Sequence, residues 1–200
     1  MINSKKTGKP KNEQFHPIIT ENDITEYVLE RFQDVKLNPS MNEIIRFHSN
    51  NKYLFMAHNQ EKLKILGNIV ANHNKKDSKE LIDIYESILI NILNDSPTVK
   101  THINVLMHIF GFFKTYFNHE QKDKFLNLIE EFRENKITLG KILRQIEPST
   151  YQINSFYLVS QSYFLLYSEP ELSNFQKLSK GSPRIKNNLM VNEQKSTIPF

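Results

Sequence analysis

Residues 102–114 read HINVLMHIFGFFK and form the most apolar stretch of this 200-residue chain. Aliphatic and aromatic side chains would cover most faces of a helix here. A polar stripe recurs along it at steps of four, three and four, at Asn104, His108, Gly111 and Thr115. We therefore expect a helix over about 98–117 that is central to the fold and its most buried element.

Residues 47–58, FHSNNKYLFMAH, place basic groups where a helix would normally bury hydrocarbon. Positions spaced by four and three share one face of a helix expected over about 41–57: Met41, Ile45, His48, Lys52, Phe55 and Asn59. His48 and Lys52 are thus expected in the middle of the apolar face. A charge buried there costs several kcal/mol unless it is paired or hydrated. These groups therefore either satisfy one another or line a site.

Capping signals bound further helices along the chain. Thr20 with Asp23 resembles a capping box and predicts a first helix that ends near residue 36. The same kind of signal predicts helices after Asn59, Ser78, Asn118 and Thr138, and an aromatic helix is expected over about 151–167. No run of alternating β-branched residues favours a strand. The expected fold is all-α, a single compact bundle of about seven or eight helices around the central apolar helix.

Five segments in order carry a family resemblance: FHSNNKYLFMAHN, LGNIVANH, THINVLMHIFGFFK, EEFRENKITL and QSYFLLYSEPEL, between Ser40 and Leu172. Together they resemble the YbgA-like domain, a bacterial domain of unknown function. The chain departs from the family in having Phe132 where Tyr is usual, and Ile137 to Gly140 where the family has a proline-containing turn. The expected domain covers 20–172, between a basic flexible tail at 1–19 and a loosely ordered tail at 173–200.

Composition limits the chemistry that the chain can perform. It contains no Cys, which excludes disulfides, thiolate nucleophiles and cysteine-ligated zinc or iron–sulfur clusters. No apolar run has the length of a signal peptide or a membrane span, so a cytoplasmic protein without membrane contact is expected. The net charge of +4 and the pI near 9.1 permit a polyanionic partner without requiring one.

The unusual polar residues form one candidate pocket for an anion such as a phosphate. Its expected lining is His48, Lys52, His58, Asn104, His108, Lys114 and Arg133. The alternative is that other helices satisfy His48 and Lys52 in the core, and that Arg133 only compensates a helix dipole. A metal site is not expected, because ten residues of helix separate His48 from His58 by about 15 Å. No cofactor is expected either.

Two further sets of residues are secondary candidates. A basic strip comprises Lys62, Lys64, Lys75 and Lys76, although such strips are often only solvated surface. The aromatic residues near the end of the predicted domain could form either a stacking platform for bases or part of the core. They are Tyr151, Phe156, Tyr157, Tyr163, Phe164 and Tyr167.

The resemblance supplies a functional expectation. YbgA-like domains also occur fused to thiouracil-desulfidase-type domains, which are associated with removing sulfur from 4-thiouridine in tRNA. This implies an RNA-binding accessory module, for tRNA, with a separate cysteine-bearing desulfidase-type partner doing the chemistry. Two alternatives remain open. One is a small enzyme that uses His48, Lys52 and His108 on an anionic or nucleotide substrate, and the other is a protein-docking scaffold.

Overall fold

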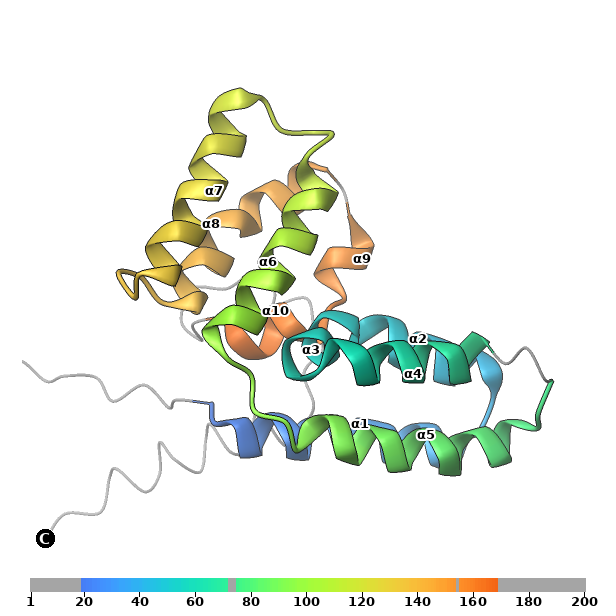
Figure 1. Cartoon of the computed structure of the whole chain (residues 1–200). Helices are drawn as coiled ribbons and strands as arrows, with labels where there is room; N and C mark the ends of the chain where they lie inside the picture. Colours follow the sequence, from blue (N-terminus) through green and yellow to red (C-terminus); the bar gives the residue numbers. More distant parts are fainter. Residues whose placement is uncertain (1–18, 72–74, 154, 169–200) are drawn as a thin grey trace, which may run out of the picture.

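Residues 19–71, 75–153 and 155–168 are described in this computed structural model, and within these ranges the chain forms ten helices and no strand (Figure 1). The first five helices are α1 (Glu21–Leu37), α2 (Met41–Asn50), α3 (Lys52–His58), α4 (Gln60–Ala71) and α5 (Ser78–Leu93). The others are α6 (Val99–Phe113), α7 (His119–Arg133), α8 (Leu139–Gln152), α9 (Phe156–Val159) and α10 (Ser162–Tyr167). The all-α expectation is confirmed. The tails expected at 1–19 and 173–200 lie almost wholly outside the described residues.

Local capping explains where several helices begin. Thr20 and Asp23 form a reciprocal capping box at α1, and Asn118 and Gln121 form another at α7. The side chain of Asn59 accepts a hydrogen bond from the backbone N–H of Lys62 over 2.9 Å at the start of α4. These caps are those that the sequence predicts, because each depends on residues only three positions apart.

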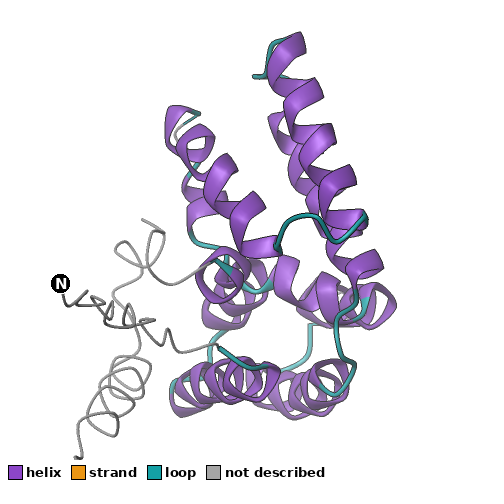
Figure 2. Cartoon of the chain, turned by 90° about the vertical axis from the view of Figure 1, so that its left-hand side faces the viewer, coloured by secondary structure: helices purple, strands orange, loops and turns teal. Residues whose placement is uncertain are grey.

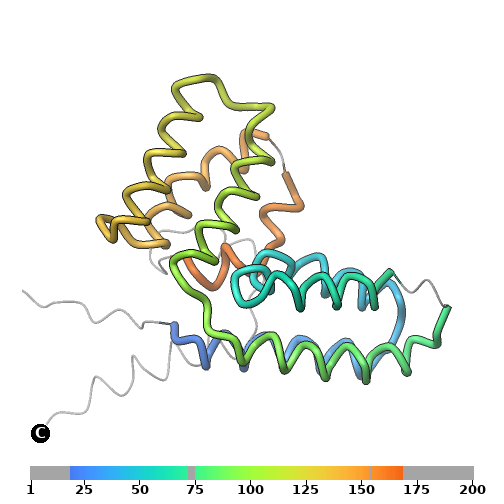
Figure 3. Tube along the Cα trace, viewed as in Figure 1, coloured from blue at the N-terminus to red at the C-terminus, as the bar shows by residue number. Residues whose placement is uncertain are grey.

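The helices form a lower and an upper group (Figure 1). α1 and α5 lie side by side, with α2, α3 and α4 above them, and α6, α7 and α8 rise from this layer. The tube in Figure 3 follows the same path, and the view turned by 90° in Figure 2 shows the same division. α10 contacts both α3 and α8, so the end of the described chain lies where the two groups meet.

α3 is the central helix. All of its residues after Lys52 are buried, and it contacts α2, α4, α5, α6 and α10. The expectation that the helix over 98–117 is the most enclosed is therefore wrong. α6 buries one face and leaves Met107, His108 and Phe112 exposed. α6 therefore carries more apolar side chains than its contacts with neighbouring helices bury.

Two helices expected to be continuous are broken, and the two breaks meet. The helix expected over 41–57 stops at Asn50, and the one expected over 151–167 is divided before α10. The side-chain oxygen of Gln161 accepts from the N–H of Tyr53 over 3.2 Å, and its amide nitrogen donates to the carbonyl oxygen of Ser49 over 2.7 Å. The break between α2 and α3 thus leaves backbone groups that the side chain of Gln161, at the second break, satisfies.

Ser162 completes this junction. Its hydroxyl donates to the side-chain oxygen of Asn51 over 2.7 Å, and the Asn51 amide nitrogen donates to the carbonyl oxygen of Phe47 over 2.8 Å. Asn51, Gln161 and Ser162 are all buried. Because buried polar groups with complete hydrogen bonding fix a local geometry, the junction holds α2, α3 and α10 in one arrangement.

Candidate functional site

His48 is half-buried in α2, and it serves the core. Its Nδ1 lies 3.1 Å from the hydroxyl oxygen of Tyr85, and its ring lies against that of Phe55. Burial, aided by the charge of Lys52, lowers the pKa of His48 to about 4. His48 is therefore neutral at pH 7 and offers no cation to a ligand.

Lys52 is exposed, which corrects its expected place in the apolar face of one long helix. Because the chain breaks at Asn51, the periodicity of α2 does not continue into α3. Lys52 is the first residue of α3 and remains in solvent, while the residues after it are buried. The spacing by four and three that predicted a buried Lys52 runs across the break between α2 and α3, so these positions do not share one helix face.

His58 is almost fully buried at the end of α3. Its Nδ1–H donates to the carbonyl oxygen of Asp95 over 2.7 Å, and its Nε2 lies 3.8 Å from a carboxylate oxygen of Glu21. Burial lowers the pKa of His58, although the Asp95 carbonyl opposes this effect. His58 is thus a neutral internal residue and not part of an open pocket.

Asn104 and His108 lie on the surface of α6. The side-chain nitrogen of Asn104 donates to the side-chain oxygen of Gln60 over 2.8 Å, and His108 is exposed. Gly111 and Thr115 are exposed too, so the polar stripe faces solvent. An amphipathic helix at a surface accounts for it.

Lys114 and Arg133 lie at opposite ends of two antiparallel helices (Figure 1). Lys114 follows the last residue of α6, and Arg133 ends α7, whose 15 residues span about 22 Å. Arg133 also donates to both carboxylate oxygens of Glu130, at 2.9 and 2.7 Å. The expected pocket therefore does not assemble from all seven residues.

The basic strip is partly neutralised. Lys62 donates to a carboxylate oxygen of Asp95 over 2.7 Å, and Lys76 pairs with Glu80. Lys64 and Lys75 are exposed.

No set of three or more His, Cys, Asp or Glu side chains in the described ranges is placed to hold a metal ion. None of the described helices is long and apolar enough to span a bilayer.

A cluster of buried and half-buried titratable side chains surrounds Glu21. Its members His58, Tyr163 and Tyr167 were sequence candidates, whereas Glu21 and His102 were not. Nδ1 of His102 lies 3.0 Å from the hydroxyl oxygen of Tyr163, and the His102 ring contacts Tyr167 at 4.9 Å between centroids. Burial lowers the pKa of His102 to about 4 and raises the pKa of Glu21. The cluster joins α1, α3, α6 and α10, which no local sequence pattern reveals.

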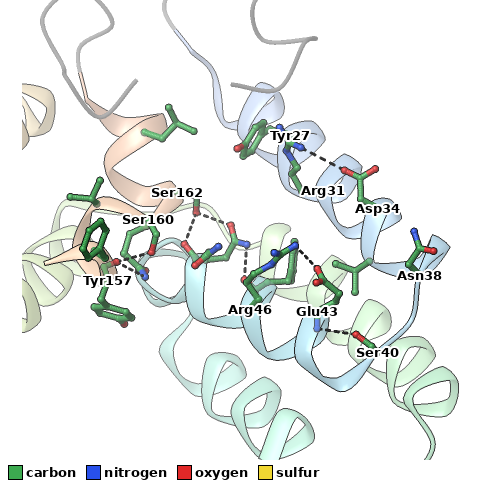
Figure 4. Close-up of a pocket in the computed structure, with 18 of the residues that line it drawn as sticks. Tyr27, Arg31, Asp34, Asn38, Ser40, Glu43, Arg46, Tyr157, Ser160 and Ser162 are labelled. Atoms are coloured by element: carbon green, nitrogen blue, oxygen red, sulfur yellow. Dashed lines mark hydrogen bonds and ion pairs between the residues drawn. The ribbon is translucent and has the colours of Figure 1, made fainter. Parts of the chain in front are cut away.

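A groove of about 1620 Å³ opens between α1, α2 and the chain from the end of α8 to α10 (Figure 4). We call it the arginine groove, because Arg31 of α1 and Arg46 of α2 both line it. Its aromatic lining includes Tyr27, Tyr151, Phe156 and Tyr157, and its amide lining includes Asn38, Asn50, Asn51 and Gln161. The junction of Asn51, Gln161 and Ser162 forms part of its wall.

The two arginines are weakly held. The guanidinium of Arg31 lies 5.5 Å from the centre of the Tyr27 ring and 3.6 Å from Asp34, and its buried Nε–H has no hydrogen-bond partner in the described part of the chain. Arg46 donates to Glu43 over 2.5 Å. Both ion pairs join residues three positions apart at the surface, where such pairs contribute about 0–1 kcal/mol. A stronger anion can therefore compete for either arginine.

The aromatic residues near the end of the domain divide into two sets. Tyr163 and Phe164 are buried in the core, whereas Phe156 is 81% exposed and Tyr151 is 41% exposed. Tyr157 is half-buried, and its ring stacks on that of Phe112 at 6.2 Å. The exposed rings thus border the arginine groove. Turn-forming residues at Asn50-Asn51 and Ser160-Gln161-Ser162 are the sequence signal that could have located it.

The fold and site together define an all-helical protein with a groove of mixed arginine, aromatic and amide lining. The family "Protein of unknown function (DUF1722)" matches residues 52–168, more than half of the chain, and the chain belongs to this family. It is similar to "Uncharacterized protein YbgA" of Escherichia coli (strain K12), with 26% identity over 125 residues, 62% of this chain and 74% of that protein. The resemblance to the YbgA-like domain is confirmed. No solved structure matches the chain.

Proposed function

We propose that this protein is an RNA-binding accessory module and that RNA enters the arginine groove. The observation that carries the proposal is the placement of Phe156, 81% exposed, in the same groove as Arg31 and Arg46. Single-stranded nucleic acid is commonly bound by aromatic rings that stack on bases together with basic side chains that contact phosphates. Each stacked base contributes about 1–3 kcal/mol.

The distribution of charge indicates how much of the binding is electrostatic. Residues 19–168 contain 17 Lys and Arg against 18 Asp and Glu, so this part of the chain is nearly neutral. The excess of positive charge comes from residues 1–18, with four Lys against one Glu, and residues 169–200, with five Lys and Arg against three Glu. Binding in the groove should therefore depend mainly on stacking and on two arginines, and only moderately on salt.

The setting of the proposed activity comes from the family resemblance. It supports tRNA as the proposed RNA and a thiouracil-desulfidase-type protein as the proposed partner that removes sulfur from thiouridine. Since this chain has no Cys, the sulfur chemistry would belong to that partner. A cytoplasmic location fits this role and is part of the proposal.

The enzyme alternative has no comparable support. No hydrogen bond or ion pair joins His48, Lys52 and His108 within the described residues, and His48 is neutral at pH 7. Acid–base work would require these groups to meet at one substrate. The docking alternative is separated from the main proposal by the test below, because a scaffold that only docks a protein partner would not bind tRNA.

The test is fluorescence anisotropy of the full-length chain with labelled tRNA at increasing salt. We expect Phe156→Ser and the double change Arg31→Met, Arg46→Met to weaken binding by at least about fivefold each. The control for Phe156→Ser is Tyr116→Ser, which removes an exposed ring away from the groove. The control for the arginine variants is Arg133→Met, because Arg133 also pairs with an acidic residue three positions away, Glu130. Absence of tRNA binding by the unchanged protein, or equal losses in variants and controls, would refute the proposal.

A further inference from the structure

We infer that the arginine groove receives one unpaired nucleotide, with its phosphate between Arg31 and Arg46, its base edge at Asn50 and its base face against the exposed aromatic rim. This inference rests on the proposed function and names the ligand of that same site. It uses three separate features of the groove, each available to a ligand.

The first feature is a place for an anion. Arg31 extends from α1 and Arg46 from α2, on two different walls of the groove (Figure 4). The side chains of their acidic partners are partly exposed, 67% for Asp34 and 35% for Glu43. A phosphate offers several charged oxygens to both guanidinium groups at once, whereas each carboxylate reaches only the arginine on its own helix.

The second feature is an amide that can read a base. Asn50 is half-buried and lines the groove, and its side-chain amide has no hydrogen-bond partner among the described residues. The neighbouring amides of Asn51 and Gln161 are already bonded within the junction of the two helix breaks. An amide offers one donor and one acceptor side by side, which matches the edge of a nucleobase.

The third feature is the fit between groove and ligand. Arg46 and Asn50 are one helical turn apart in α2, about 6 Å of axial rise, so one nucleotide can reach from Arg46 to the Asn50 amide. Phe156 of α9 and Tyr151 of α8 also line the groove, and both are exposed. A volume of 1620 Å³ exceeds the roughly 300–1,000 Å³ of sites that enclose a small molecule. The groove therefore suits one residue of a longer strand better than an enclosed metabolite.

The experiment measures binding of 5′-mononucleotides, the matching nucleosides and inorganic phosphate to the full-length protein by ligand-observed NMR and calorimetry. We expect at least one mononucleotide to bind about tenfold more tightly than its nucleoside and more tightly than inorganic phosphate. Arg46→Met should remove this advantage of the nucleotide, and Arg133→Met should retain it. Asn50→Leu should reduce the differences among the four bases, and Phe156→Ser should weaken nucleoside binding. Thermal unfolding of every variant establishes that it is folded.

The outcomes separate this inference from the proposed function. If tRNA binds but no mononucleotide does, and the groove variants bind tRNA normally, the nucleotide site is refuted while RNA binding by another surface survives. If mononucleotides bind with the expected pattern and tRNA does not, the nucleotide site stands and the RNA-binding module is refuted. Equal affinity for nucleotides and inorganic phosphate would overturn the inference by reducing the site to a simple anion site.

Discussion

The hydroxyl of Tyr167 lies 3.1 Å from each carboxylate oxygen of Glu21 and donates to this carboxylate, which joins the last residue of α10 to the first residue of α1. The Glu21 carboxylate is also the closest acidic group to Nε2 of His58, which is buried and has no hydrogen-bond partner in the described ranges. Since Nδ1 of His58 carries the proton donated to Asp95, the neutral ring presents a lone pair to Glu21.

Tyr167→Phe should lower the free energy of unfolding by about 1–2 kcal/mol, because a hydrogen bond to a carboxylate is lost while the ring remains. Urea denaturation measures the change. Tyr116→Phe is the matched control, because Tyr116 is 62% exposed. A loss of equal size in the control would show that the Glu21 contact contributes nothing.

Stability should fall as the pH falls from about 6.5 to about 4. Burial lowers the pKa of His48 and His102 to about 4, and it lowers that of His58 too. The unfolded chain, with histidine pKa values near 6.5, then binds more protons than the folded chain, so stability rises with pH in this range. The raised pKa of Glu21 acts in the opposite direction, but it is one group against three.

Urea midpoints measured from pH 7.5 to 4.5 test this dependence. His102→Gln should make the slope shallower, because it removes one of the three histidines. His108→Gln is the matched control, because it removes a histidine whose side chain is exposed to solvent. A midpoint independent of pH would contradict the assignment of His48, His58 and His102 as neutral side chains.

Phe113→Ala should destabilise the protein by about 3–5 kcal/mol, the usual cost of removing a fully buried phenylalanine. Phe113 is 0% exposed, and its ring stacks on Phe117 at 4.8 Å. The adjacent Phe112 is 36% exposed, so Phe112→Ala should cost at most about half as much. Equal losses in denaturation experiments would mean that α6 packs through a different face.

Gly67→Ala should stabilise the protein by about 0.5–1 kcal/mol, because glycine inside a helix costs conformational entropy. A Cβ atom at position 67 would lie 3.8 Å from Nε2 of His48, an ordinary contact, so helix packing does not require glycine there. Gly111→Ala should stabilise equally, since nothing lies within 4 Å of its added Cβ. Thermal unfolding compares the two, and a loss at position 67 alone would indicate that His48 cannot adjust.

The sequence predicted the all-α class and most helix starts because caps and apolar periodicity act over three or four residues. It failed at the breaks in 41–57 and 151–167, because the groups that compensate them are far apart in the chain. Gln161 and Tyr53 are separated by 108 residues. Lys52 was misplaced for the same reason, since its predicted burial assumed an unbroken helix.

Because Lys52 is exposed, Lys52→Met should change the free energy of unfolding by less than about 0.5 kcal/mol, as measured by urea denaturation.

The candidate site was the least predictable part. Arg31 and Arg46 resemble ordinary surface arginines in the sequence, and only the approach of α1 and α2 to α9 and α10 brings them together with Phe156. The cluster around Glu21 also combines four helices. Residues that come together from distant parts of the chain leave no spacing pattern in a single sequence.

The ring of Tyr85 packs on Phe32 at 5.4 Å and on Phe47 at 6.1 Å, and both of these residues precede the family match, which begins at Lys52. The segment that the family match covers is therefore shorter than the unit that folds. A fragment cut at residue 52 would keep Tyr85 and Phe55 but lose the α1 and α2 side chains that cover them. Such a fragment would expose its own core to water and invite aggregation.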